Sequence, residues 1–292
     1  PSAVALYFVC NLASEKLKVV LSGEGADEIF GGYNVYSEPD GTAYDRLPKG
    51  VKKCIGSIAQ KLPAKRGVNF FVRKGKDLEE RFIGNAYMFT PAERKALLRV
   101  KTNAPLPQDI TKPYYDNVKN KDDVTKMQYL DLHLWMAGDI LLKADKMSMA
   151  NSLELRVPFL DKEVMSLAER IPLRYRVTHK EYTDEHTKYI TKYAMRLSAK
   201  KDTPKQTSKT AAKKKLGFPV PIRVWLKEEK YYNTVKSYFQ SDISKKLFNT
   251  DMIIKLLDDH RNGKADNSRK IWTVFTFLVW YNVYFENNGK FA

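Results

Sequence analysis

The segment from Val19 to Tyr33, with the sequence VVLSGEGADEIFGGY, constrains the fold of this chain more than any other. The apolar run that leads into it, LKVVLS at residues 17–22, has two β-branched residues and stops at Ser-Gly, which is typical of a buried strand. Apolar residues at helical spacing predict a helix over residues 3–15. A helix followed by a buried strand is half of a parallel-sheet unit, so we predict an interior or near-interior parallel strand at 17–22.

The loop after this strand has more glycines and carboxylates than a simple turn requires. Gly23 and Gly25 allow close backbone approach to a ligand, and Glu24 lies between them. Ligands of open parallel sheets bind beyond the carboxyl ends of the strands, and Mg²⁺ binds carboxylates together with phosphate oxygens. The loop therefore predicts nucleotide chemistry. The alternative is that Asp27 and Glu28 only favour a first helical turn, which leaves Glu24 unexplained.

The sequence after Tyr33 is predominantly helical, with no second convincing strand. We predict that at least half of it is helix. Helices are predicted at 49–61, 77–85, 91–99, 122–149, 161–170, 185–198, 221–229, 250–262 and 268–286. The Lys-rich segment 200–215 is predicted to be an exposed loop. Because one strand does not make a sheet, the other strands are expected to precede Pro1.

The formal net charge of +17 permits a polyanion-binding surface. The lysines are spread along the chain, however, and no zinc-finger, RNP or basic-zipper pattern is present. We therefore interpret the charge as that of the basic part of a larger, more balanced protein, and a nucleic-acid partner is not favoured. The four histidines lack metal-ligand spacing.

The low cysteine content indicates a protein of a reducing compartment, with the cytoplasm as the expected location. Cys10 and Cys54 are the only cysteines and make no disulfide framework. The longest apolar run, at 271–285, is shorter than the roughly 20 residues of a membrane span. We predict a buried C-terminal helix and no membrane role. Further residues are predicted to be core: Met147, Met149, Trp272, Phe275, Val279 and Trp280.

Three stretches together resemble the synthetase domain of glutamine-hydrolysing asparagine synthetases. They are LSGEGADEIFGGY at 21–33, LLKADKMSMANSLELRVPFLD at 141–161 and KKKLGFPVPIRVWL at 213–226. The resemblance covers essentially the whole chain and implies an α/β, predominantly helical fold. That fold is the C-terminal part of a Rossmann-like parallel-sheet ATP pyrophosphatase domain, similar to adenine nucleotide alpha hydrolases. Residues 1–47 would end the nucleotide core, and 48–292 would form the helical remainder.

The resemblance also implies the reaction. ATP activates the β-carboxylate of aspartate as an acyl-adenylate, and ammonia from glutamine then gives asparagine and AMP. The implied cofactors are ATP and Mg²⁺. The implied partners are aspartate, ammonia or glutamine, and an N-terminal glutaminase domain of the same chain, and a homodimer is a candidate assembly. The family's pyrophosphate loop, Ser-Gly-Gly-x-Asp-Ser, is expected before Pro1, so the chain alone is expected to be inactive.

Matching residues carry the roles that the resemblance implies. The backbone of Ser22 and Gly23 would line the nucleotide. Glu24 would help form and consume the adenylate, with a carboxylate suited to proton transfer. Asp27 would help hold Mg²⁺–pyrophosphate, whereas Glu28 is interpreted as a helix N-terminal charge.

The resemblance implies two further catalytic residues, but it leaves their exact positions open. Lys215 would lie near the phosphates, although the register within Lys213–Lys215 is open, and a solvated charge run is the alternative for Lys213. Asp139 would be a carboxylate facing the site, but its i,i+4 spacing to Lys143 also suits an ordinary helix pair. Arg156 and Asp161, which flank the turn VPFL, are predicted to form a structural ion pair.

Two other functions remain open from the sequence. The first is a related adenylating enzyme that acts on another carboxylate, such as a β-lactam synthetase or another amidotransferase. The second is a non-catalytic basic interaction module. Salt-dependent association with random DNA would favour the second, and ATP-dependent asparagine formation would exclude it.

Overall fold

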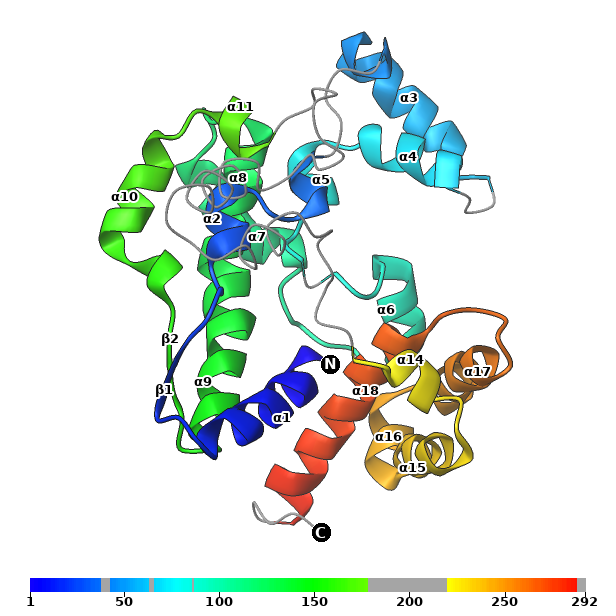
Figure 1. The fold of residues 1–292 in the computed structure, drawn as a ribbon. Helices are drawn as coiled ribbons and strands as arrows, with labels where there is room; N and C mark the ends of the chain where they lie inside the picture. The colour runs from blue at the N-terminus through cyan, green and yellow to red at the C-terminus, as the bar shows by residue number, and fades with distance from the viewer. Residues whose placement is uncertain (38–42, 63–65, 86, 178–219, 288–292) are drawn as a thin grey trace. The chain divides into compact units, whose positions relative to one another are not determined.

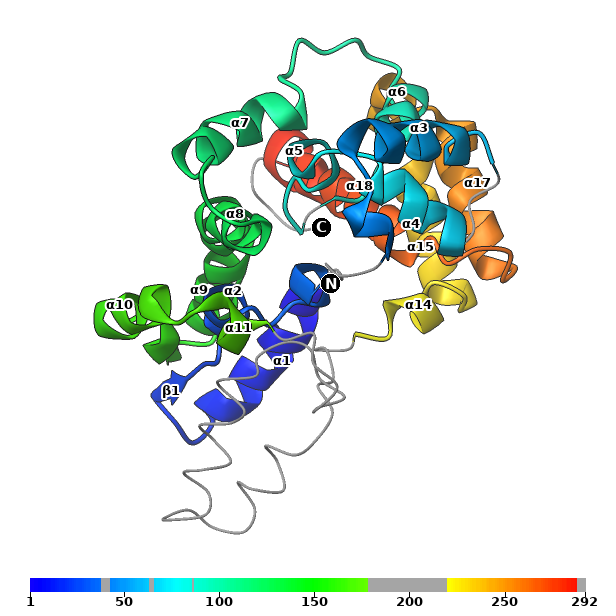
Figure 2. The same ribbon diagram turned by 90° about the horizontal axis from the view of Figure 1, so that it is seen from above.

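The computed structural model describes residues 1–37, 43–62, 66–85, 87–177 and 220–287 (Figures 1 and 2). The chain divides into two compact units. Unit 1 comprises Pro1–Val9, Tyr87–Ala104 and Leu216–Ala292, and unit 2 comprises Cys10–Ala86 and Pro105–Lys215. These units follow packing in space, whereas the boundary predicted after residue 47 separates a nucleotide core from a helical remainder and stays a prediction.

Unit 1 is a helical assembly around an apolar core (Figure 1). Its helices are α6 Pro91–Leu97, α14 Ile222–Trp225, α15 Glu229–Phe239, α16 Asp242–Leu247, α17 Thr250–Arg261 and α18 Ser268–Tyr281, which continues as a π-helical segment, η5 Asn282–Glu286. The capping box of α6 forms as its sequence predicts, because Thr90 Oγ1 accepts from Glu93 N and Glu93 Oε2 from Thr90 N. Glu93 also pairs with Lys270 of α18.

The buried face of α18 differs from the predicted one. The fully buried residues of this helix are Ile271, Val274, Leu278 and Ser268. The predicted core residues Trp272, Phe275 and Val279 are half-buried, and Trp280 is 46% exposed. Aromatic residues occupy so many positions of α18 that spacing alone does not select one face. Met149 is 59% exposed, so its assignment to the core is wrong, while Met147 is half-buried.

Unit 2 contains the only sheet among the described residues and most of the helices (Figures 1 and 2). The N-terminal helix α1, Ser2–Ser14, contributes its first part to unit 1 and the rest to unit 2. The elements that follow are β1 Val19–Leu21, α2 Ala26–Phe30, η1 Asn34–Ser37, η2 Ala43–Arg46, α3 Lys49–Ala59, α4 Arg66–Lys74, α5 Leu78–Arg81, α7 Pro107–Asn117, α8 Asp123–Leu130, the π-helical segment η3 Asp131–Leu141, α9 Leu142–Met149, β2 Glu154–Arg156, η4 Pro158–Leu160, α10 Lys162–Arg170 and α11 Leu173–Arg176.

The parallel strand predicted at 17–22 is present as β1, and its partner is β2. Val19 pairs with Glu154, Val20 with Leu155 and Leu21 with Arg156. The prediction that β1 is buried is wrong for this chain, because Val19 is 43% and Leu21 is 74% exposed. Among the described residues the sheet has only these two strands, and the side chains of Val19 and Leu21 stay exposed.

Most predicted helices are confirmed within a few residues, and the described residues are mainly helical. The segment predicted at 122–149 is one long helix in which α8, η3 and α9 follow without a break. The helix predicted at 221–229 is shorter, since α14 ends at Trp225. Five α-helices in the described part of the chain were not predicted, namely α4, α7, α11, α15 and α16. The helix at 185–198 and the loop at 200–215 lie outside the described residues.

No helix in the described part of the chain is long and apolar enough to cross a membrane. Cys10 is buried and Cys54 is exposed, and both are free thiols, as their number predicts.

Helices α3 and α4 approach each other at backbone distance. A Cβ atom on Gly75, directly after α4, would lie 2.6 Å from the Cα of Gly56 and 2.9 Å from the carbonyl oxygen of Lys52. A Cβ on Gly56 would lie 2.8 Å from the Cα of Gly75. Only glycine fits at these two positions, so the pair fixes the spacing of α3 and α4.

We therefore expect Gly75→Ala to lower the free energy of unfolding by about 1–3 kcal/mol, the usual cost of overpacking. Gly50→Ala is the matched control on α3, because a Cβ there meets nothing within 4 Å. Thermal unfolding and hydrogen exchange of α3 and α4 in the complete protein measure the difference. Equal stability of the two variants would contradict the close packing.

Candidate functional site

The loop Ser22–Asp27 connects β1 to α2 at the carboxyl end of the parallel strand pair. The backbone N–H of Ser22 donates to the Arg156 carbonyl at 2.8 Å and extends the strand pairing by one residue. The Ser22 hydroxyl accepts from the Glu24 N–H at 3.3 Å. These bonds turn the chain sharply after the strand and place Glu24 at the end of the sheet.

Glycine is required at both ends of α2 for conformational reasons. Gly25 precedes the helix with φ +90°, and Gly31 follows it with φ +69°, in the left-handed region that disfavours side chains. Gly23 has no such constraint, and a Cβ there would meet nothing within 4 Å. Folding of the described residues therefore does not by itself demand glycine at position 23.

Glu24 forms an ion pair with Lys143 of α9. The Lys143 Nζ atom lies 3.4 Å from Glu24 Oε1, and the two side chains are only 14% and 25% exposed. The pair joins two stretches of sequence that both carry the resemblance described above. Partial burial makes its electrostatic attraction stronger than that of an exposed pair such as Lys112–Asp116.

The two carboxylates of α2 have different environments. Asp27 is half-buried, and its backbone carbonyl accepts from Gly32 N–H. Glu28 is 1% exposed, and its Oε1 accepts a hydrogen bond from the Tyr33 hydroxyl at 2.5 Å. Glu28 lies in the first turn of α2, as its interpretation as a helix N-terminal charge predicts, but burial and the bond from Tyr33 also make it an internal hydrogen-bonded group.

Gln128 of α8 holds the C-terminal end of α2. Its Nε2 donates to the carbonyls of Glu28 at 2.6 Å and Ile29 at 3.0 Å, and its Oε1 accepts from Arg176 at 2.7 Å. Both polar atoms of the buried amide are therefore satisfied. These hydrogen bonds from Gln128 hold α2, and with it the loop Ser22–Asp27, against the long helix that carries Lys143.

A second buried carboxylate, Asp131, lies at the start of η3. It is fully buried, and its Oδ2 accepts from the Tyr36 hydroxyl at 2.5 Å and from Asn85 Nδ2 at 2.8 Å. Burial raises the pKa of the Asp131 carboxyl to about 7. The hydrogen bonds from the Tyr36 hydroxyl and the Asn85 backbone N–H oppose the rise, and the nearby charge of Glu28 adds to it.

The expected helix pair between Asp139 and Lys143 does not form among the described residues. Asp139 is exposed in η3, where i→i+5 hydrogen bonds widen the turn and change which residues face each other, and Lys143 pairs with Glu24 instead. The ion pair predicted for Arg156 and Asp161 is also wrong. Arg156 pairs with Glu154 at 2.8 Å, and Asp161 caps α10 by accepting from the Glu163 N–H.

The structure thus brings together the first two resembling stretches, at Ser22–Asp27 and around Lys143. Lys213, Lys214 and Lys215 lie outside the described residues, so their register stays a prediction. In the described ranges, no group of three or more His, Cys, Asp or Glu side chains could hold a metal ion.

The sequence model of the asparagine synthase family matches residues 1–282 of this chain. The chain belongs to the asparagine synthase family. It is 44% identical over 288 residues to asparagine synthetase [glutamine-hydrolyzing] 1 of Bacillus subtilis, a match that covers 98% of this chain and 44% of the relative.

Other relatives extend the same pattern. A putative asparagine synthetase [glutamine-hydrolyzing] of Mycobacterium tuberculosis H37Rv is 39% identical over 290 residues, covering 99% of this chain and 43% of the relative. A putative asparagine synthetase of Methanocaldococcus jannaschii is 24% identical over 176 residues, covering 60% and 18%. The chain therefore spans less than half the length of these members of the asparagine synthase family.

Three residues of this site were given no role by the sequence analysis. Lys143 was considered only as an ordinary helix partner, although its place in a stretch that resembles the family was a usable signal. Gln128 and Asp131 lie in a plain helical pattern and carry no local signal. Their importance follows from burial, which only the folded chain defines.

The raised pKa of Asp131 predicts a pH-dependent loss of stability. Below about pH 4 the carboxyl is protonated in both folded and unfolded chains and contributes no difference. Between the ordinary pKa of 3.8 and about 7, the unfolded carboxyl is ionised while the folded one keeps its proton, so stability falls as pH rises. Above about pH 7 the loss is complete and constant.

We expect Asp131→Asn to remove this component, because asparagine accepts from Tyr36 and Asn85 without ionising. The difference in unfolding temperature, wild type minus variant, should fall between pH 4.5 and 7 and level off above. Asp116→Asn, at an exposed carboxylate, is the control, and its unfolding temperature should change with pH as that of the wild type does. Parallel curves for wild type and Asp131→Asn would refute the assignment.

Proposed function

We propose that the complete protein containing this chain makes asparagine by ATP-dependent amidation of aspartate. Membership of the asparagine synthase family and the names of the relatives support this proposal. Because the chain spans less than half of those relatives, the rest of the activity would need residues outside it. We also propose that β1 and β2 belong to a parallel sheet of the ATP pyrophosphatase type.

The observation that carries the proposal is the Glu24–Lys143 ion pair at the carboxyl end of β1. Ligands of parallel sheets bind at such strand ends. The pair is partly buried, and its two residues come from separate stretches of the region that the family matches. The Glu24 carboxylate is held by Lys143 and flanked by Gly23 and Gly25, which have no side chains, so it is suited to contact a reacting substrate.

The proposed reaction has two steps. The β-carboxylate of aspartate attacks the α-phosphorus of ATP, forming β-aspartyl-AMP and releasing pyrophosphate. Ammonia then attacks the acyl carbon and expels AMP. In this scheme the backbone of Ser22 and Gly23 lines the nucleotide, and Glu24 accepts a proton from the attacking nitrogen. Lys143 is a positioning residue that orients the Glu24 carboxylate, and Asp139 is proposed to face the same site.

Mg²⁺ fits this site as a companion of ATP rather than as a resident ion. The described residues contain no cluster of metal ligands, whereas Mg²⁺ commonly uses one or two carboxylates together with substrate phosphates. Asp27 is proposed to supply one such carboxylate. The ion would offset the negative charge of the departing pyrophosphate.

The proposed partners extend beyond this chain. We propose that glutamine supplies the ammonia through an N-terminal glutaminase domain of the same polypeptide, consistent with the relatives' names and lengths. The exposed apolar side chains of Val19 and Leu21 would pack against other parts of the complete protein. A cytoplasmic location and a homodimer remain proposals of the same kind.

We expect Glu24→Gln to abolish asparagine synthesis in the complete protein while glutamine hydrolysis continues. The variant keeps the size of the side chain but removes its charge and its ability to accept a proton. Asp27→Asn should also abolish synthesis, with partial recovery at raised Mg²⁺ concentration. Comparing the amide products formed from aspartate and from other carboxylates checks which substrate the enzyme uses. Near-normal synthesis by Glu24→Gln would exclude Glu24 from the reaction.

Lys143→Met should lower kcat for asparagine by about 10²-fold, the typical effect of misplacing a reacting group. Lys143→Arg should recover part of the loss, because it keeps the charge beside Glu24. Lys112→Met is the matched control, since it breaks an exposed lysine–carboxylate pair and should leave kcat unchanged. A similar kcat for both methionine variants would rule out the positioning role.

Lys215→Ala should cost more activity than Lys213→Ala, if Lys215 stabilises the leaving phosphates. The loss of a placed electrostatic group typically raises the barrier by about 2.7–4 kcal/mol, or about 10²–10³ in rate, whereas a solvated lysine contributes little. Steady-state kinetics of pyrophosphate release compare the two. The reverse order would shift the register of the lysine run.

A further inference from the structure

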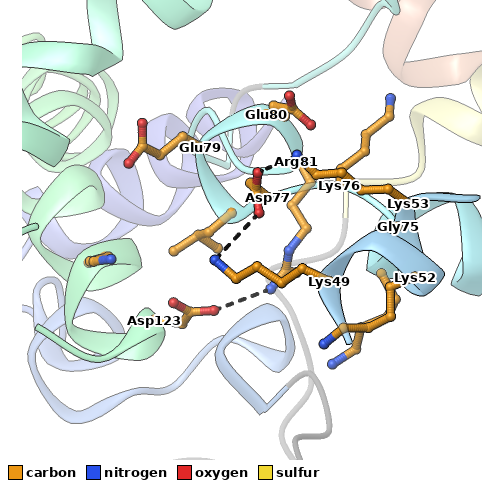
Figure 3. A pocket seen from close by; sticks show the side chains of 13 residues that line it. Lys49, Lys52, Lys53, Gly75, Lys76, Asp77, Glu79, Glu80, Arg81 and Asp123 are labelled. Atoms are coloured by element: carbon orange, nitrogen blue, oxygen red, sulfur yellow. Dashed lines mark ion pairs between the residues drawn. The ribbon is translucent and has the colours of Figure 1, made fainter. Parts of the chain in front are cut away.

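We propose that a cationic cavity in unit 2 binds a small, multiply charged phosphate compound of the oligophosphate class. The cavity has a volume of about 560 Å³ and lies among α3, the end of α4, α5 and the start of α8 (Figure 3). It shares no residue with the loop Ser22–Asp27. Its lining residues are Lys49, Lys52, Lys53, Lys74, Gly75, Lys76, Asp77, Leu78, Glu79, Glu80, Arg81, Asp123 and Lys126.

The charge of the lining is strongly positive. Among the described lining residues, seven lysine and arginine side chains accompany four carboxylates, and they come from α3, the end of α4, the loop after it, α5 and α8. Lys52, Lys74 and Lys126 are half-buried, and the Arg81 side chain is only 12% exposed. Burial lowers the pKa of the Arg81 guanidinium, while Asp123 opposes this effect from 3.9 Å. The lining carries both signs of charge, and seven cations against four carboxylates leave a net excess of three positive charges, which favours anions in this concave site.

The backbone fixes the positions of these lysines. The contact between Gly56 and Gly75 leaves no room for a Cβ atom, so the Lys52–Lys53 turn of α3 is held against the end of α4. Asp77 accepts a hydrogen bond from Lys53 at 2.8 Å and lies 3.9 Å from Lys49 (Figure 3). Asp77 therefore anchors two lysines at one side of the cavity. The hydrogen bond from Lys53 also lowers the pKa of the Asp77 carboxyl.

The lining selects the chemical class of the ligand. Among the described residues that line the cavity, Leu78 is the only large apolar side chain, and none has an aromatic ring on which a nucleobase could stack. Lysine ammonium groups bind phosphate as compact point charges, and six lysines line this cavity. The volume falls within the range of small-molecule sites. These features favour linked phosphate groups over a nucleoside, and a bounded cavity over the extended groove of a nucleic-acid site.

The test is lysine footprinting of the complete protein with inorganic tripolyphosphate as the probe. A water-soluble acetylating reagent is applied without Mg²⁺, and peptide mass spectrometry follows each lysine. At a probe concentration ten times the dissociation constant, acetylation of Lys52, Lys74 and Lys126 should slow about tenfold. Exposed Lys119, outside the cavity, should be unaffected, as should all four lysines in sulfate of equal ionic strength.

A double variant, Lys52→Ser with Lys126→Ser, sharpens the test. It should raise the tripolyphosphate concentration that half-protects Lys74 by at least about tenfold, through loss of charge-assisted contacts. Lys119→Ser should leave that concentration unchanged. Absence of protection at the cavity lysines, or equal protection of Lys119, would overturn the proposal. Protection by a DNA oligonucleotide but not by tripolyphosphate would also overturn it, in favour of a nucleic-acid surface.

Discussion

The parallel pairing of β1 with β2 is the constraint on which the candidate site depends. The pairing aligns Val19–Leu21 with Glu154–Arg156, although more than 130 residues separate them in sequence. The loop after β1 and the helix before β2 are thereby brought to the same region, where Glu24 meets Lys143. The helical spacing alone offers Asp139 as a partner for Lys143, whereas the folded chain pairs this lysine with Glu24, which lies far from it in sequence.

Buried polar groups then hold the loop in place. The Gln128 amide donates to two carbonyls at the end of α2. Glu28 and Asp131 each accept a hydrogen bond from a tyrosine hydroxyl. A buried acceptor that loses its donor costs about 1–3 kcal/mol, so such groups specify one arrangement of neighbouring helices. The raised pKa of Asp131 shows the accompanying cost, since burial disfavours its charged form.

The elements that sequence patterns failed to predict lack a strong local signal. Helix α7 contains Pro113, a residue that usually breaks helices, and α15 is rich in aromatic and β-branched residues. Helix α15 forms because Tyr232, Val235 and Phe239 pack into the core of unit 1, and packing outweighs local propensity. The strand β2 is missed by the sequence analysis, because three residues carry too little pattern to be distinguished from an extended loop.

The sequence by itself determined the strand and loop at 17–27, the capped start of α6 and the family, because these depend on local residue types in a fixed order. It also placed Glu24 and Asp27 among the candidate site residues. Only the tertiary structure decided that Lys143 pairs with Glu24, that Glu28 and Asp131 are buried, and that the lysines of α3, α4 and α8 surround one cavity. Those features depend on which helix faces meet across long stretches of sequence, and burial has no local pattern.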